Sequence, residues 1–257
     1  MYRKLIHFYG PFSINSFGVM IAIGLGIFTW LTLRHPWREK LISKDSFIQV
    51  LSIGTIVGII GGRILFIISD WKYITRWYDI FAIWEGGFSL LGTVISIAFF
   101  LPMYLKKINI PILPFCDLVA LHAPLLQSIS RIGCFIAGCC YGSQTQLLWN
   151  ITYTHHDAFA PLCIPLHPTQ LYSAIGLFFI FLLMYFITQK LVTKPGQVLY
   201  SYLMLVSSER FIIDFFRGDR EFYAFFHLFS IHQYIAFGIF FIASILLLLT
   251  LINKKKN

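Results

Sequence analysis

The sequence is poor in charge and has no long polar stretch. Only 12% of its 257 residues are charged, and acidic residues are the scarcer kind, with 11 Asp and Glu against 20 Lys and Arg. No polar tract is long enough to fold separately, and there is no internal repeat or low-complexity segment beyond the apolar runs. These absences exclude an ordinary soluble domain.

What remains is apolar sequence, and it predicts an all-α, polytopic integral membrane protein. Hydrophobic residues make up 58% of the chain, and the mean hydropathy is +0.75. A helix of about 20 apolar residues crosses a bilayer core, and seven runs of that kind are bounded by Lys, Arg, Pro or polar clusters. We expect one transmembrane domain over residues 1–257. Its expected spans are about 12–33, 47–69, 87–105, 113–138, 170–188, 197–216 and 232–253.

The distribution of Lys and Arg predicts how these helices are oriented. With the N-terminus outside, the inner segments contain eleven Lys and Arg and the outer segments six, while the longest outer loop, 139–169, contains none. The positive-inside rule therefore favours N-terminus out and C-terminus in. The net charge of +9 is mainly a consequence of this topology, with attraction to anionic membrane lipids as a second effect. It indicates no nucleic-acid partner.

Three arginines, Arg63, Arg131 and Arg210, lie inside expected spans. A charge near the bilayer centre costs at least about 2.5 to 3.5 kcal/mol, so each needs a partner or a hydrated functional cavity. Arg63 follows Gly61 and Gly62, where the missing side chains allow another backbone or a ligand to come close.

One interpretation is that carboxylates neutralise these arginines and merely fix helix packing. Arg210, Asp214 and Arg217 lie at i, i+4 and i+7 on one helix face, so Asp214 can neutralise Arg210. Asp117 falls about 40° from Arg131 on an ideal helix and could lie on the same side. The basic groups nevertheless outnumber the acids of the spans once Arg217 is counted, which favours an anionic ligand.

The end of the outer loop offers a further anion site. Pro168 stands where the fifth span begins, and the free N–H groups of a first helical turn favour anions. His167 and Gln170 would lie beside it, although a histidine there is more often a surface or capping residue. Together these features predict a basic pocket at the outer leaflet, suited to a phosphate headgroup.

The five cysteines allow more than one interpretation. Two of them fall in expected spans, and three fall on or near the outer loop, where a disulfide can form. A zinc site with the histidines of that loop is the rival, but adjacent cysteines lack the usual C-x2-C spacing. We favour structural cysteines and expect no metal and no cofactor. The outer-loop residues concerned are Cys139, Cys140, Cys163, His155, His156 and His167.

Five stretches resemble the bacterial prolipoprotein diacylglyceryl transferases. They are GGRILF at 61–66, WEGGFSLLGTVIS at 84–96, RIGCFIAGCCYG at 131–142, HPTQLY at 167–172 and RFIIDFFR at 210–217. They follow the family's order and approximate spacing over nearly the whole chain.

The resemblance implies a multi-pass enzyme of the bacterial inner membrane, with the N-terminus outside. It would transfer the diacylglyceryl group of phosphatidylglycerol to the thiol of the lipobox cysteine in a prolipoprotein signal peptide, forming a thioether and releasing glycerol phosphate. It implies catalytic roles for Arg131 and Arg210. We expect the substrate-binding residues to be Arg63, Gly142, His167, Gln170, Glu209 and Arg217.

The chain departs from the family pattern where proton transfer is concerned. Leu91 stands where the family commonly has a histidine, and Cys134 and Cys139 replace an asparagine and a glutamate. His167 is one substitute for the missing base; alternatively, nearby guanidiniums lower the pKa of the substrate thiol. Two other functions stay open: a paralogous transferase with another nucleophile, and a lipid-binding or transport protein without catalysis.

Overall fold

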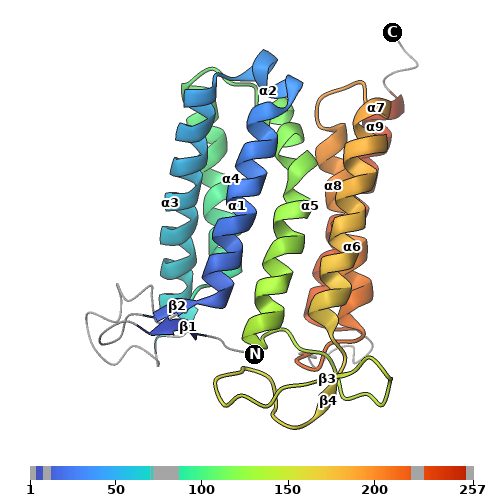
Figure 1. The fold of residues 1–257 in the computed structure, drawn as a ribbon. Coiled ribbons are helices and arrows are strands. Elements are labelled where there is room, and N and C mark those ends of the chain that lie inside the picture. The colour runs from blue at the N-terminus through green and yellow to red at the C-terminus, as the bar shows by residue number, and fades with distance from the viewer. Residues whose placement is uncertain (1–3, 8–12, 70, 72–86, 221–228, 253–257) are drawn as a thin grey trace. The chain divides into compact units, whose positions relative to one another are not determined.

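The computed structural model describes residues 4–7, 13–69, 71, 87–220 and 229–252. Most of these residues are α-helical (Figure 1), which confirms the prediction of an all-α membrane protein. Residues 84–86 of the second matched stretch lie outside the described residues, as do Arg3, Lys72, Arg76 and Lys254 to Lys256 of the charge count.

Residues 138–168 form the longest connection that the structure describes throughout. The helices are α1 (Ser16–Arg34), α2 (Pro36–Leu41), α3 (Lys44–Ser69), α4 (Leu90–Lys107), α5 (Ile112–Ala137), α6 (Thr169–Leu183), the π-helical turn η4 (Met184–Thr188), α7 (Gln189–Leu191), α8 (Gln197–Asp214) and α9 (Ile231–Ile252). The strands β1 (Lys4–His7) and β2 (Ser13–Asn15) form one pair, and β3 (Ile151–Thr152) and β4 (Pro165–Leu166) form another, antiparallel pair.

Six of the described helices are long and apolar enough to cross a membrane: α1, α3, α4, α5, the continuous stretch Thr169–Leu191, and α9. The seventh expected span forms α8, which has 18 residues but includes three charged residues, Glu209, Arg210 and Asp214. The structure therefore confirms a polytopic protein. The count of seven spans and the orientation stay predictions.

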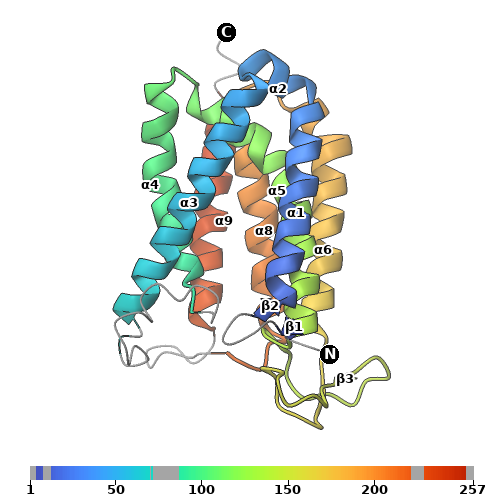
Figure 2. The ribbon, with the colours of Figure 1, turned by 60° about the vertical axis from the view of Figure 1, so that its left-hand side comes forward.

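The described residues form two compact units. The smaller unit comprises the described residues between Leu33 and Phe115 and contains α2, α3 and α4. Within it, α3 and α4 pack closely along their length, as both views show (Figures 1 and 2). A Cβ on Gly61 would overlap the side chain of Ser96, so only glycine permits this helix approach.

The larger unit contains most of α1, then α5, the long loop that follows it, and α6 to α9. Its helix α8 packs against α9 and also against α6 (Figure 1). The loop of residues 138–168 and strands β3 and β4 lie at the end where α5 and α8 finish and where α6 and α9 begin (Figure 1). The buried side chains of Tyr153, Ala160 and Leu166 give this loop a core of its own.

Asp117 has a different partner from the one considered in the sequence analysis. Its carboxylate accepts hydrogen bonds from the backbone N–H groups of Gly196 (2.6 Å) and Leu199 (2.8 Å). It therefore caps the N-terminus of α8, where a negative charge also interacts favourably with the helix dipole. Asp117 is not the counter-ion of Arg131.

Candidate anion-binding site

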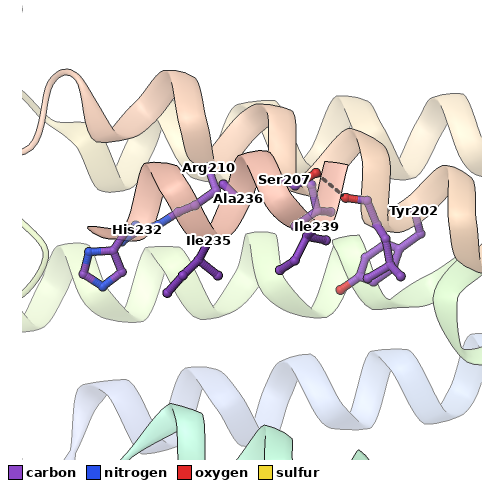
Figure 3. A pocket seen from close by; sticks show the side chains of 9 residues that line it. Tyr202, Ser207, Arg210, His232, Ile235, Ala236 and Ile239 are labelled. Carbon is purple, nitrogen blue, oxygen red and sulfur yellow. Dashed lines mark hydrogen bonds between the residues drawn. The ribbon is translucent and has the colours of Figure 1, made fainter. Parts of the chain in front are cut away.

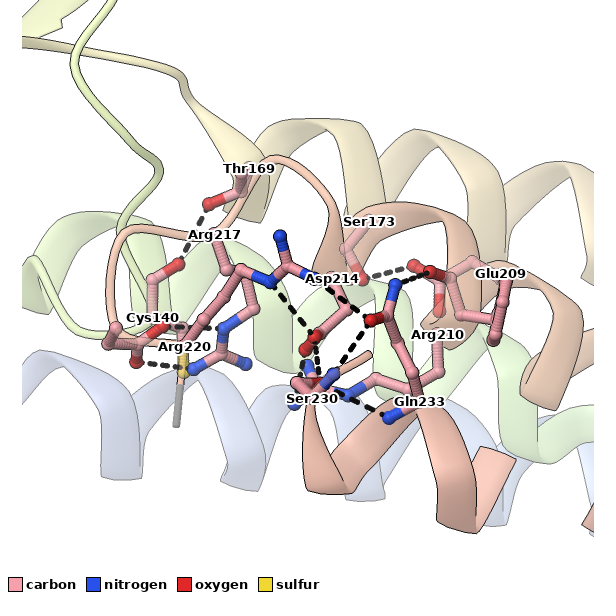
Figure 4. Close-up of polar contacts among 12 residues, drawn as sticks. Cys140, Thr169, Ser173, Glu209, Arg210, Asp214, Arg217, Arg220, Ser230 and Gln233 are labelled. Atoms are coloured by element: carbon pink, nitrogen blue, oxygen red, sulfur yellow. Dashed lines mark hydrogen bonds and ion pairs between the residues drawn. The ribbon is translucent and has the colours of Figure 1, made fainter. Parts of the chain in front are cut away.

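The charged residues at the end of α8 form a connected network (Figure 4). Arg210 lies 3.5 Å from the buried carboxylate of Asp214, which confirms the expected i, i+4 pair. Asp214 also accepts a hydrogen bond from Ser230 and lies 3.7 Å from the guanidinium of Arg220. One carboxylate is thus shared by two arginines, so it cannot fully neutralise both.

Gln233 links this network to α9. Its side-chain oxygen accepts hydrogen bonds from Arg220 and from the backbone N–H of Ser230, both at 2.9 Å, and its amide nitrogen donates to the carbonyl of Phe211 at 3.2 Å. Gln233 is fully buried. Because these bonds join Gln233 of α9 to Phe211 of α8 and to Arg220 after it, the glutamine holds the start of α9 against the end of α8.

Arg131 comes to the same network from α5. Its charge interacts with those of Glu209 and Arg210 on α8. Within the described part of the chain, it makes no ion pair or hydrogen bond through its guanidinium. Arg131 therefore has no carboxylate partner there, whereas Arg210 is paired with Asp214.

Arg217 is positioned by backbone pairing rather than by a helix. Residues 141–143 pair with the segment around Arg217 on one side, through Ser143 N–H to Phe216 (2.8 Å) and Gly218 N–H to Tyr141 (3.0 Å). On the other side, Gly142 N–H donates to the carbonyl of His167 at 3.1 Å. Three segments distant in sequence are thereby joined.

Gly142 is required at the centre of this arrangement. A Cβ there would come within 2.4 Å of both the Cβ and the carbonyl oxygen of His167. Gly142 and His167, both expected to bind substrate, thus lie in backbone segments that pair with each other and with the segment that contains Arg217. The ring of His167 contacts Tyr172 and Phe216.

The guanidinium of Arg217 is held in its charged form. Burial opposes ionisation, but hydrogen bonds to the carboxylate of Asp219, one of them 2.7 Å long, outweigh it and raise the pKa of Arg217 above its usual range. Arg217 and Arg131 both repel Arg210 electrostatically. Three guanidiniums thus lie close enough to interact, which is the arrangement that a multiply charged anion stabilises.

Glu209 of α8 and Gln170 of α6 lie where these two helices face each other. Ser173 donates a hydrogen bond of 2.6 Å to the Glu209 carboxylate. Gln170 is buried and donates to the carbonyl of Cys139 at 2.8 Å, while its side-chain oxygen has no partner among the described residues. Helix α6 therefore holds the Glu209 carboxylate of α8 through Ser173, and holds the loop after α5 through Gln170.

The loop after α5 brings three thiols together beside the arginines. The Sγ atoms of Cys134, Cys139 and Cys140 all lie within 4.8 Å of one another. Hydrogen bonds from the other two thiols, with added attraction from Arg217 and Arg131, hold the pKa of Cys140 well below its usual range. All five cysteines of the chain are free, including Cys163, which is exposed on the loop.

An apolar cavity of about 220 Å³ opens between α8 and α9 beside the network (Figure 3). Its walls are aliphatic side chains such as Val206, Ile235 and Ile239, and its polar groups include Arg210 and His232. A guanidinium at the edge of an apolar cavity suits a ligand with a charged head and a hydrocarbon chain.

Two residues named from the sequence belong to the smaller unit. Arg63 is buried there, donates a hydrogen bond of 2.8 Å to the carbonyl of Gly87, and lies over the ring of Phe66. Leu91, at the family's histidine position, is in the first turn of α4 and is 62% exposed. The other site residues expected from the sequence are all in the larger unit.

Three residues of this network were not predicted from the sequence: Arg220, Ser230 and Gln233. Gln233 had a signal, since it is a polar residue near the start of the last expected span and such residues usually need a specific partner. Arg220 and Ser230 had none, because both lie between helices and reach Asp214 only through the folded chain.

Comparison with known proteins agrees with this geometry. A family model described as prolipoprotein diacylglyceryl transferase matches residues 3–249. The chain is 37% identical over 209 residues to the phosphatidylglycerol–prolipoprotein diacylglyceryl transferase of Clostridium tetani, which covers 80% of this chain and 82% of the relative. It is 34% identical over 210 residues to phosphatidylglycerol–prolipoprotein diacylglyceryl transferase 2 of Clostridium perfringens, which covers 80% of each. It is 31% identical over 208 residues to the corresponding Clostridioides difficile transferase, with the same coverage.

Proposed function

The chain belongs to the prolipoprotein diacylglyceryl transferase family, and from this premise we propose that it transfers the diacylglyceryl group of phosphatidylglycerol to a prolipoprotein. The acceptor is the thiol of the lipobox cysteine in the signal peptide, and the enzyme acts in the bacterial inner membrane. The observation that carries the proposal is the meeting of Arg131, Arg210 and Arg217 beside an apolar cavity.

The arrangement suits a phospholipid in both of its parts. Two oxygens of the phosphate can accept parallel hydrogen bonds from one planar guanidinium. A lysine ammonium group does not provide this bidentate geometry. An acyl chain fits against the aliphatic side chains of α8 and α9 that line the cavity. Arg131 and Arg210 act on the phosphate; Gly142, His167, Gln170, Glu209 and Arg217 hold the surrounding backbone and charges in place.

The reaction is a displacement at carbon. The thiolate sulfur of the acceptor attacks the glyceryl carbon that carries the phosphate, a carbon–sulfur bond forms, and the carbon–oxygen bond breaks. Its electron pair leaves on the phosphate oxygen, which departs as glycerol phosphate. Guanidiniums aimed at that oxygen stabilise the developing charge. They also favour the thiolate form of the incoming cysteine, which matters because Leu91 replaces the family's histidine.

A turnover assay tests this function. The purified full-length protein is incubated with phosphatidylglycerol and a lipobox peptide, and both glycerol phosphate and the thioether peptide are measured by mass spectrometry. The expected result is equal formation of the two products. Phospholipid binding without either product indicates a non-catalytic lipid-binding protein, and glycerol phosphate without modified peptide indicates a paralogous transferase.

The protein's own thiols provide an internal control. We expect direct transfer to the substrate, so Cys134, Cys139 and Cys140 should carry no lipid after incubation with phosphatidylglycerol alone. A diacylglyceryl adduct on any of them, detected in the intact protein, contradicts direct transfer and indicates a covalent intermediate.

A further inference from the structure

The strongest feature that the proposed reaction leaves unused is the group of thiols at the end of α5. Cys134 is in the last turn of the helix, and Cys139 and Cys140 follow it in the loop. From the sequence, the candidate zinc ligands are the outer-loop cysteines together with the loop histidines. The folded chain instead brings Cys134, from within the helix, to the adjacent pair.

We propose that Cys134, Cys139 and Cys140 form a binding site for one thiophilic d¹⁰ metal ion, for which Zn²⁺ is the probe. Thiolates are the preferred ligands of such ions. In a tetrahedral site with Zn–S bonds of about 2.3 Å, the sulfurs lie about 3.8 Å apart. The three sulfurs here already lie within 4.8 Å of one another, so rotation of the side chains suffices to close the site.

The backbone fixes the ligands before any ion arrives. The chain leaves α5 through two residues with positive φ, Gly138 (76°) and Cys140 (58°), the second being unfavourable for a residue with a side chain. The carbonyl of Cys139 accepts a hydrogen bond from Gln170, and that of Cys140 accepts one from Thr169, both at 2.8 Å. Both loop ligands are therefore tied to the start of α6, and the sulfurs need little ordering to bind an ion.

The surrounding charge also suits a metal–thiolate complex. Three thiolates and one divalent ion leave a net charge of about −1. Arg131 and Arg217 both interact electrostatically with Cys140, so the residual negative charge has cationic neighbours. The site has three protein ligands, which leaves a fourth coordination position for water or another small ligand.

A second group of side chains that could bind a metal lies on the loop and is more exposed to solvent. His155, His156 and Asp157 are consecutive residues on the loop, and the side chain of His156 is 81% exposed. The two histidine rings stack on each other, and both lie within 4 Å of the Asp157 carboxylate. Exposed groups of this kind commonly hold no ion, so these residues serve as the matched control.

The first experiment measures bound metal in the purified full-length protein. The protein is prepared in detergent under a non-thiol reductant and equilibrated with Zn²⁺, and unbound ion is removed before elemental analysis. About one Zn²⁺ per chain is expected, as for a single thiolate site. Cys139→Ser and Cys140→Ser should each reduce retained zinc at least tenfold, whereas Cys163→Ser should retain it.

The control on the other group is His155→Ala combined with His156→Ala, which should also keep one zinc per chain. If this double variant loses the zinc and the cysteine variants keep it, the assignment is wrong. It is equally wrong if the unsubstituted protein retains no zinc, or if intact-mass analysis shows that the cluster forms a disulfide even under reductant.

A spectroscopic measurement on the unsubstituted chain guards against misfolding of the variants. Co²⁺ replaces Zn²⁺ in thiolate sites and then absorbs in the near ultraviolet through sulfur-to-metal charge transfer. Titration of the metal-free protein with Co²⁺ should produce this band and saturate near one equivalent, and added Zn²⁺ should abolish it. A titration without the band overturns the proposal, whatever the variants show.

Discussion

Replacing Arg131 by lysine separates a phosphate ligand from a packing charge. Lysine keeps the positive charge but loses the planar fork that contacts two oxygens. Since Arg131 has no ion pair within the described part of the chain, the exchange removes no native salt bridge, and the stability should change by no more than about 0.5 kcal/mol. Loss of one transition-state donor costs about 2.7 to 4 kcal/mol, so kcat should fall about a hundredfold to a thousandfold.

The assay is the release of glycerol phosphate by purified, detergent-solubilised protein with lipobox peptide at saturating phospholipid. The matched control is Arg38→Lys, the same exchange at a buried arginine of α2 in the smaller unit, which donates to the carbonyl of Leu33 and pairs with Glu39. It should leave the rate per folded molecule unchanged. Near-full activity of Arg131→Lys would refute the reasoning, because the arginine would then serve only for packing. Arg210→Lys should also lose most activity.

Three further predictions concern topology and the support of the site. Alkaline phosphatase fused near Asp157 should be active and fused near Arg38 inactive, since the outer loop contains no Lys or Arg; the reverse pattern contradicts the orientation. Gly142→Ala should destabilise the protein by about 1 to 3 kcal/mol, seen as a lower melting temperature in detergent, because the new Cβ meets a backbone oxygen at 2.4 Å; an unchanged temperature contradicts this. Asp214→Asn, which leaves buried guanidiniums without their carboxylate, should cost about 3 to 5 kcal/mol, whereas the same exchange at the more exposed Asp219 should cost far less.

The helices could be predicted from sequence because membrane spans are defined by length and hydropathy alone. The expected span 113–138 is the helix Ile112–Ala137, and the expected span 232–253 is the helix Ile231–Ile252. In each case the helix begins and ends within about two residues of the change from apolar to polar sequence. Local composition carries this information, and no tertiary contact is needed to read it.

Charged partners on the same helix could be predicted from the sequence, whereas partners on another helix could not. The pair of Arg210 and Asp214 is four residues apart on one helix, so helical periodicity predicts it. Asp117 was considered for Arg131 by the same periodicity, but it caps α8 instead, where backbone N–H groups of another helix donate to its carboxylate. Periodicity places a side chain on a face; it does not say which neighbouring element covers that face.

The thiol cluster shows where sequence reasoning stops. Cys134 belongs to an apolar helix, and C-x2-C spacing, the usual sign of zinc ligands, is absent. The three sulfurs meet because the chain turns through Gly138 and Cys140 with positive φ, a backbone conformation that a pattern of residue types does not specify. The same loop then pairs with the segment that holds Arg217. The thiols and the guanidinium are therefore fixed by one stretch of backbone, and a metal ion bound to the thiols should reduce the motion of Arg217 as well.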